Sequence, residues 1–259
     1  NATMIWDETA KLDLHKAAYN TMISKTSDFG SGCSADGNII IHESIFEDAI
    51  KALIDVGGYL LNEEEQEAVK RIMWDENCHR LPQSVAQSAQ KMAELAGFSI
   101  PEDRKFLIAR GTGSYTTSYE DVWCREKLTT VLAVHKYEGD FQNAIDIVKA
   151  IHEVGGKGHS VGIFSFDDEH IHQLALQAQV GRIMVRQPQS KSNAGSFTNG
   201  MPMTSSLGCG TWGGNATSEN IHLKHYMNIT WVSREIPEDR PSDEELFGEF
   251  YEPEKENLE

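Results

Sequence analysis

The chain alternates between segments with helical spacing of apolar residues and short runs of β-branched and other apolar residues. Helical spacing occurs over residues 7–23, 45–56, 63–73, 84–96, 141–154 and 171–179. The runs between them predict strands over residues 38–42, 105–109, 129–135, 161–166 and 182–185. Strands that alternate with helices through short connections are typical of βαβ units. The pattern therefore predicts an α/β fold with an open, largely parallel sheet and flanking helices.

The last third of the chain has a different composition. Residues 187–220 are rich in Gly, Ser and Asn and form a longer loop than a compact domain needs as a connection. Residues 235–259 are acidic, with Phe247, Phe250 and Tyr251 spaced for contact with another surface. We therefore predict an α/β domain over 1–186, a loop region with a return segment over 187–234, and a partly ordered acidic tail over 235–259.

The composition excludes several classes of protein. With 259 residues, the chain is long enough to bury a large core. Its 23 Lys and Arg against 40 Asp and Glu give a formal net charge of −17, which repels a phosphate backbone and excludes a general nucleic-acid surface. No apolar run approaches the roughly 20 residues needed to cross a bilayer, and no signal segment opens the chain. We therefore expect a soluble, cytoplasmic protein without a nucleic-acid or membrane partner.

Four cysteines offer candidate chemistry. They show neither CxxC pairing nor metal-site spacing with histidine, so we predict reduced thiols and no metal site. Cys33 lies in a loop of small residues, in which Gly30 and Gly32 allow a sharp turn and a close backbone approach. A thiol presented there is a candidate nucleophile for a carbonyl carbon. The alternative is a small residue packed in a tight turn, and spacing alone does not decide between them.

Several segments of the chain resemble the CoA-acylating branch of the aldehyde dehydrogenase superfamily. Residues 23–35 are similar to the family's nucleophile segment, and residues 126–134, 155–160 and 207–220 match further motifs in the family's order. The segment Leu207-Gly-Cys-Gly-Thr-Trp-Gly-Gly-Asn is the most specific, because it resembles the acylating enzymes rather than the hydrolytic ones. The resemblance covers residues 4–233. It implies the aldehyde dehydrogenase catalytic fold without most of the N-terminal cofactor-binding domain, a fragment expected to be inactive by itself.

The resemblance implies an NAD- or NADP-dependent oxidation of an aldehyde to an acyl-CoA. Cys33 would attack the aldehyde, the hemithioacetal would pass hydride to the nicotinamide, and coenzyme A would take the acyl group from the Cys33 thioester. The Cys33 backbone N–H would stabilise the oxyanion. Glu126 would contact the nicotinamide ribose, or else be a solvated surface residue. His159 would accept the proton of the coenzyme A thiol, or else order a Gly-rich turn. The loop region over 187–234 would line the cleft, where Cys209 packs.

The substrate is expected to be a small aldehyde. Residues 199–203 and 243–250 are most similar to family members that act on sulfoacetaldehyde. Succinate semialdehyde and acetaldehyde are alternative substrates that the same enzyme fold would accept. For an anionic aldehyde we predict contacts from Arg182, Arg186 or Lys191, whose alternative role is surface ion pairing. The family also implies a homo-oligomer. Two other functions stay open: a hydrolytic aldehyde dehydrogenase, and a non-catalytic assembly module of the same fold.

Overall fold

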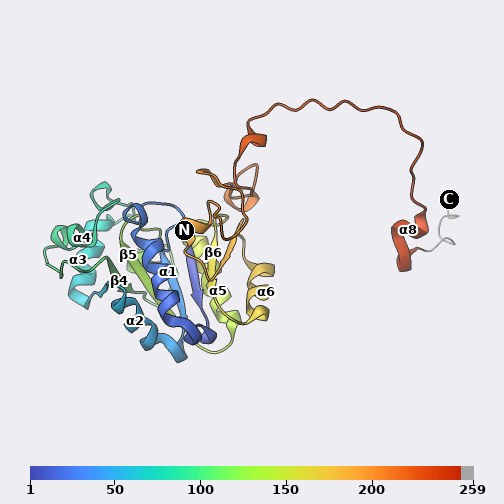
Figure 1. Cartoon of the computed structure of the whole chain (residues 1–259). Coiled ribbons are helices and arrows are strands. Elements are labelled where there is room, and N and C mark those ends of the chain that lie inside the picture. Colours follow the sequence, from blue (N-terminus) through green and yellow to red (C-terminus); the bar gives the residue numbers. More distant parts are fainter. Residues whose placement is uncertain (252–259) are drawn as a thin grey trace. The chain divides into compact units, whose positions relative to one another are not determined.

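The computed structural model describes residues 1–251, and within them the chain forms one sheet of seven parallel strands (Figure 1). The strands are β1 Thr3–Trp6, β2 Asn38–His42, β3 Gly58–Leu60, β4 Phe106–Arg110, β5 Val131–Tyr137, β6 Val161–Phe164 and β7 Ile183–Val185. Their order across the sheet is β3-β4-β5-β2-β1-β6-β7, and every neighbouring pair is parallel. The predicted α/β fold with an open, parallel sheet is confirmed.

Most of the helices lie between successive strands along the chain. They are α1 Leu14–Thr26, α2 Phe46–Asp55, α3 Glu63–Met73, α4 Ala89–Ala96, α5 Phe141–Gly155, α6 Asp168–Gln177, α7 Gln189–Ser192 and α8 Asp243–Phe247. Predicted and observed bounds agree within one residue for α2, α3 and α5. The helix predicted from residue 7 begins instead as the 3-10 turn Glu8–Asp13. The helix predicted over 84–96 starts at Ala89, because the Ser88 side chain caps it there.

Helices cover both faces of the sheet, and Figure 1 shows α1 on the near side of the strands. Successive strand residues point to opposite faces, so each strand contributes to two apolar layers. The layer under α1 and α2 includes Met4, Trp6, Ile39, Ile41, Ile108 and Val134. The opposite layer includes Ile5, Ile40, Val161 and Ile163 under α5 and α6, and Leu107, Ala109, Val131 and Ala133 under α3 and α4. The sheet is therefore the core of the molecule.

The sequence pattern does not predict β1 or β3. β1 lies between β2 and β6, with Thr3 level with Asn38 on one side and Val161 on the other. All four of its residues are buried. A short strand that is buried on both faces shows no alternation of polar and apolar residues, so periodicity cannot reveal it.

The parallel sheet gathers distant segments at its two edges. Residues that immediately precede strands lie together at one edge, which we call the amino edge. They include Ala2, Gly37, Thr130, Ser160 and Arg182. Residues that follow strands lie at the opposite, carboxyl edge, and they include Asp7, Ser165 and Arg186.

The contacts divide the chain into two compact units, Asn1–His225 and Tyr226–Glu259. This division differs from the predicted boundaries at 187 and 235. Much of the predicted loop region belongs to the first unit, because Gln189 and Asn220 hydrogen-bond to residues at the amino edge. The second unit contains α8, within the predicted acidic tail, whose residues 252–259 lie outside the described part. No described helix is long and apolar enough to span a bilayer.

Buried histidines are expected to make the fold sensitive to acid. Burial lowers the pKa of His152 to about 4 and that of His135 to about 3. An unfolded histidine titrates near pH ~6.5, so below that pH the unfolded chain binds more protons and the free energy of unfolding falls. Each histidine adds a slope of up to about 1.4 kcal/mol per pH unit. Burial raises the pKa of Asp36 to about 6, so this carboxyl binds a proton more readily in the folded chain. Its titration therefore offsets the fall in unfolding free energy that one histidine causes.

Urea denaturation between about pH 4.5 and pH 6.5 checks this expectation. Stability should fall as the pH is lowered, and His152→Gln should give a shallower slope because it removes one titrating group. A slope identical to that of the native chain would contradict the assignment.

Candidate active site

Cys33 and His159 meet at the amino edge of the sheet. Cys33 lies on the loop that precedes β2, and His159 lies on the turn that precedes β6. These two strands flank β1, which brings together residues that are 126 positions apart in sequence. The His159 Nε2 atom lies 3.1 Å from the Cys33 Sγ atom. The candidate nucleophile and the candidate base are therefore in direct contact.

The loop that carries Cys33 has an unusual backbone. Asp28, Phe29 and Gly30 have consecutive φ angles of 47°, 52° and 68°, all in the left-handed region. A Cβ atom at Gly30 would clash with the Thr129 carbonyl oxygen. Glycine at this position thus allows the close backbone approach that the sequence predicts. The group that approaches Gly30 is the backbone of Thr129. Gly32, by contrast, faces open space.

Cys33 and His159 are both uncharged in the resting site. Although Cys33 is exposed, its surroundings exclude enough water to raise the pKa of the thiol, and the Glu126 carboxylate raises it further. Burial and neighbouring positive charge, including that of Arg182, lower the pKa of His159 to about 4. A neutral imidazole beside a neutral thiol can act as a general base during attack, because the opposite charges that then form lie next to each other.

Glu126 lies close enough to Cys33 to influence its pKa. The Arg80 Nη2 atom lies 3.6 Å from one carboxylate oxygen of Glu126, whose side chain is 33% exposed. The other oxygen, Oε1, has no hydrogen-bond partner among the described residues. Glu126 also lines a hollow of about 180 Å³ together with Trp74 and Arg125. The carboxylate can therefore accept a hydrogen bond from a ligand hydroxyl, as the resemblance implies.

Arg182 is buried and holds the loop region against the sheet. Its Nη1 atom donates to the His159 carbonyl at 3.0 Å, and its Nε atom donates to Asn220 Oδ1 at 2.9 Å. Its Nη2 atom donates to the carbonyl oxygens of Gly208 and Ser218. Every guanidinium nitrogen thus has a protein acceptor. This arrangement argues against the predicted substrate contact and indicates that Arg182 orients the His159 turn.

The other two cations predicted to contact the substrate are placed differently. Arg186 follows β7 at the carboxyl edge, where it donates to the Ser165 carbonyl and lies 4.8 Å from the centre of the Phe166 ring. Because Cys33 is at the amino edge, the structure contradicts a contact between Arg186 and an aldehyde held at Cys33. Lys191, on α7, is exposed and makes no ion pair with the described residues. Its substrate contact stays a prediction.

The structure adds buried polar residues that the sequence pattern does not indicate. Ser160, Gln189, Asn193 and Asp36 form a hydrogen-bonded group with His159. The Ser160–Gln189 contact joins residues 29 positions apart, and the Gln189–Asp36 contact joins residues 153 positions apart. No spacing motif could have revealed such a group, because the parallel sheet assembles it from the loops before β2 and β6 and from the region of α7.

Two clusters of potential metal ligands lie in the described part of the chain, one of Asp7, Glu8 and His170 and one on the loop that ends the first compact unit. Glu219, His222 and His225 each place one ligand atom within 4.8 Å of the others. The Lys224 ammonium already contacts the Glu219 carboxylate. That contact neutralises the charge that a metal ion would need, so we assign this second cluster no metal.

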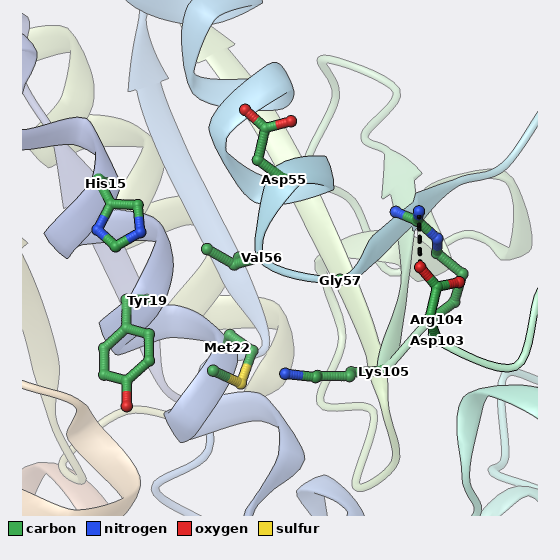
Figure 2. Close-up of a pocket in the computed structure, with 9 residues that line it drawn as sticks. All are labelled: His15, Tyr19, Met22, Asp55, Val56, Gly57, Asp103, Arg104 and Lys105. Atoms are coloured by element: carbon green, nitrogen blue, oxygen red, sulfur yellow. Dashed lines mark hydrogen bonds and ion pairs between the residues drawn. The ribbon is translucent and has the colours of Figure 1, made fainter.

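A hollow of about 410 Å³ lies elsewhere in the first unit (Figure 2). Its lining includes His15, Tyr19 and Met22 of α1. Figure 2 shows the ion pair between Arg104 and Asp103 on its other side, with a nitrogen–oxygen distance of 3.1 Å. The hollow shares no lining residue with the surroundings of Cys33 and His159, so we do not assign it to the same chemistry.

Gly158, next to His159, is expected to tolerate no side chain. Its φ is 98°, and a Cβ atom there would lie 2.5 Å from the Cys209 carbonyl oxygen. Gly156 has a φ of 94° but open space at its Cβ position, which makes it a matched control. We expect Gly156→Ala to cost about 1 kcal/mol of unfolding free energy and Gly158→Ala roughly 2 kcal/mol more. Urea denaturation measures the difference, and equal losses would contradict this account.

Comparisons with known proteins give consistent matches. Residues 1–232 match the model described as "Aldehyde dehydrogenase family". The chain is 39% identical over 242 residues to a protein of Acholeplasma sp named sulfoacetaldehyde dehydrogenase, covering 92% of this chain and 49% of that protein. It is 36% identical over 255 residues to one of Bilophila wadsworthia named sulfoacetaldehyde dehydrogenase (acylating), covering 97% of this chain and 54% of that protein.

A solved structure of an aldehyde dehydrogenase also matches the chain. The crystal structure of an acetylating aldehyde dehydrogenase from Geobacillus thermoglucosidasius matches with a TM-score of 0.82 and 32% sequence identity. The match covers 92% of this chain and 52% of that one. The chain thus spans about half the length of the curated relatives it matches.

Proposed function

The chain belongs to the aldehyde dehydrogenase family, and on that premise we propose that its protein oxidises a small aldehyde to an acyl-CoA through a thioester on Cys33. The observation that carries this proposal is the 3.1 Å contact between Cys33 Sγ and His159 Nε2. The Bilophila wadsworthia relative, named sulfoacetaldehyde dehydrogenase (acylating), supports the acylating branch.

The first step uses only residues of this chain. His159 Nε2 takes the proton of the Cys33 thiol, and the sulfur forms a bond to the aldehyde carbon while the carbonyl π electrons move to the oxygen. The Cys33 backbone N–H donates to that oxygen. Arg182 keeps the His159 turn in place during this step, because it donates to the His159 carbonyl at 3.0 Å.

The remaining chemistry needs two small molecules. Bound NAD or NADP would supply the hydride acceptor that turns the hemithioacetal into a thioester, and coenzyme A would supply the thiol that takes the acyl group. Glu126 would hold the nicotinamide ribose through its unpaired Oε1 atom. His159 Nε2 would release the Cys33 proton to solvent after hydride transfer. It would then accept the proton of the incoming thiol and return it to the departing Cys33 sulfur, with which it is in contact.

The substrate proposal rests on the relatives. We propose sulfoacetaldehyde, because two relatives carry that name. The donors of Arg182 are engaged by the protein, and Arg186 lies at the carboxyl edge. Lys191 is therefore the remaining candidate, among the three predicted cations, for the sulfonate group.

The experiment follows NADH or NADPH formation by the whole protein with sulfoacetaldehyde, succinate semialdehyde and acetaldehyde, each with and without coenzyme A. We expect turnover to require coenzyme A and to be fastest with sulfoacetaldehyde. Turnover without coenzyme A would move the protein to the hydrolytic class. Absence of turnover with every aldehyde would favour a non-catalytic assembly module.

A further inference from the structure

A chain of buried side chains lies behind His159. The His159 Nδ1 atom is 2.8 Å from Ser160 Oγ, which is 3.0 Å from Gln189 Oε1. The Gln189 Nε2 atom is in turn 2.6 Å from Asp36 Oδ1. Ser160, Gln189 and Asp36 have no exposed surface, and Asp36 immediately precedes the turn into β2 at the amino edge. We call these three residues and His159 the buried polar chain.

The orientation of the Gln189 amide is fixed by a backbone carbonyl. Gln189 Nε2 lies 2.8 Å from the Thr3 carbonyl oxygen, which can only accept a hydrogen bond. The NH2 group must therefore face Thr3 and Asp36, and the Oε1 atom must face Ser160. Because Oε1 can only accept, the Ser160 hydroxyl must give its single hydrogen to Gln189.

The hydrogen bonds of Asn193 agree with this assignment of Ser160 as a donor to Gln189. Its Nδ2 atom lies 3.1 Å from the Gln189 backbone carbonyl and 3.2 Å from Ser160 Oγ. The carbonyl again can only accept, so the NH2 group of Asn193 faces both atoms. Ser160 Oγ is thus an acceptor toward Asn193 and a donor toward Gln189.

The hydrogen bonds of Ser160 determine which ring nitrogen of His159 carries the hydrogen. Since the only hydrogen of the Ser160 hydroxyl is already used, its oxygen can interact with Nδ1 only as an acceptor, and Nδ1 must carry a hydrogen. A neutral imidazole has one protonated nitrogen, so Nε2 is bare. That bare nitrogen is the atom 3.1 Å from the Cys33 sulfur.

We propose that Ser160 and Gln189 are positioning residues that fix the Nδ1–H tautomer of His159, so that Nε2 can accept the Cys33 proton. In the opposite tautomer, an N–H group would face the sulfur and could not remove its proton. When His159 becomes protonated, the Nδ1–H bond to Ser160 becomes charge-assisted and stronger. The inference rests on the roles proposed above for Cys33 and His159.

The test is the tautomer of His159, read from nitrogen-15 NMR of histidine-labelled protein at neutral pH. The signal is assigned by its loss in His159→Gln. In the native protein we expect Nδ1 protonated and Nε2 bare. Ser160→Ala should increase the ratio of the Nε2–H form to the Nδ1–H form about tenfold, because it removes the acceptor at Nδ1. Ser160→Thr, which keeps a hydroxyl at the same place, should restore the native ratio.

A second readout is the rate at which iodoacetamide alkylates Cys33, mapped by mass spectrometry. Ser160→Ala should slow it by the factor by which the fraction of the Nδ1–H form falls, about twofold for a native ratio of roughly one to ten, and Ser160→Thr should not. The matched control is Ser190→Ala, because the Ser190 hydroxyl is buried beside Gln189 without a hydrogen-bond partner in the described structure. It should leave both the tautomer and the rate unchanged.

Two outcomes would overturn the inference: an Nε2–H tautomer in the native protein, or a tautomer and rate in Ser160→Ala equal to those of Ser190→Ala. If Ser160→Ala does not fold, Gln189→Met tests the same chain, because it removes the acceptor of the Ser160 hydrogen, frees Ser160 to donate to Nδ1 and should raise the share of the Nε2–H form. Turnover of Cys33→Ala is independent of these measurements. Failure of the tautomer test therefore leaves the proposed reaction standing, whereas activity of Cys33→Ala removes it.

Discussion

Replacement of Cys33 by alanine is expected to lower aldehyde-dependent NADH or NADPH formation by the whole protein roughly 10⁴-fold or more. Alanine has no atom that can form the bond to the aldehyde carbon, and within residues 1–251 no other thiol is held against a base. His159 Nε2 lies 3.1 Å from Cys33 Sγ, and this contact is the structural reason for expecting covalent chemistry here. Steady-state rates with coenzyme A present provide the measurement.

Cys209→Ala is the matched control for this variant. Cys209 is half-buried and lies close enough to Cys33 to raise its pKa. No base is seen in contact with its sulfur in the described part of the chain, so its loss should leave turnover close to that of the native protein. Equal losses in the two variants, or retained activity in Cys33→Ala, would contradict the assignment of the nucleophile.

His159→Gln is expected to lower kcat/KM by about 10²- to 10⁴-fold, the range that a positioned general base contributes. The Cys33 thiol is held protonated, because burial and Glu126 raise its pKa. Attack on the aldehyde therefore depends on a nearby atom that takes the proton. Glutamine can fill the space but cannot accept a proton, so alkylation of Cys33 at neutral pH should slow as well.

His152→Gln separates this effect from a general loss of stability. His152 is also buried, and burial lowers its pKa to about 4, but its Nε2 atom lies 3.1 Å from Thr3 Oγ1 rather than from Cys33. Its replacement should lower stability and spare the rate of Cys33 alkylation. If both variants slow alkylation equally, the base assigned to His159 is wrong.

Local signals explain why much of the fold is predictable from the sequence. α3 begins after Asn62, whose side chain forms a capping box with Glu65, and its observed bounds are those predicted. β2 is a run of apolar residues that also matches its prediction. The sequence pattern does not predict β1, although this strand lies between β2 and β6 in the sheet. Its four residues are all buried, so they show no alternation of polar and apolar positions that would mark a strand.

The candidate site is predictable only in part. The motifs around Cys33 and His159 single out both residues, but only the parallel order of β2, β1 and β6 brings them into contact. The same topology separates Arg186 from Cys33, since the two residues lie at opposite edges of the sheet. Arg182 lies at the same edge as Cys33, but its donors are engaged by backbone carbonyls and by Asn220.

Trapping of the acyl-enzyme tests the central claim most directly. The whole protein is incubated with the aldehyde and the nicotinamide cofactor but without coenzyme A, then digested and examined by mass spectrometry. The account predicts the mass of one acyl group on the peptide that contains Cys33, and loss of that mass when coenzyme A is added. An unmodified Cys33 peptide under conditions of turnover, or acyl groups on Cys209 instead, would contradict it.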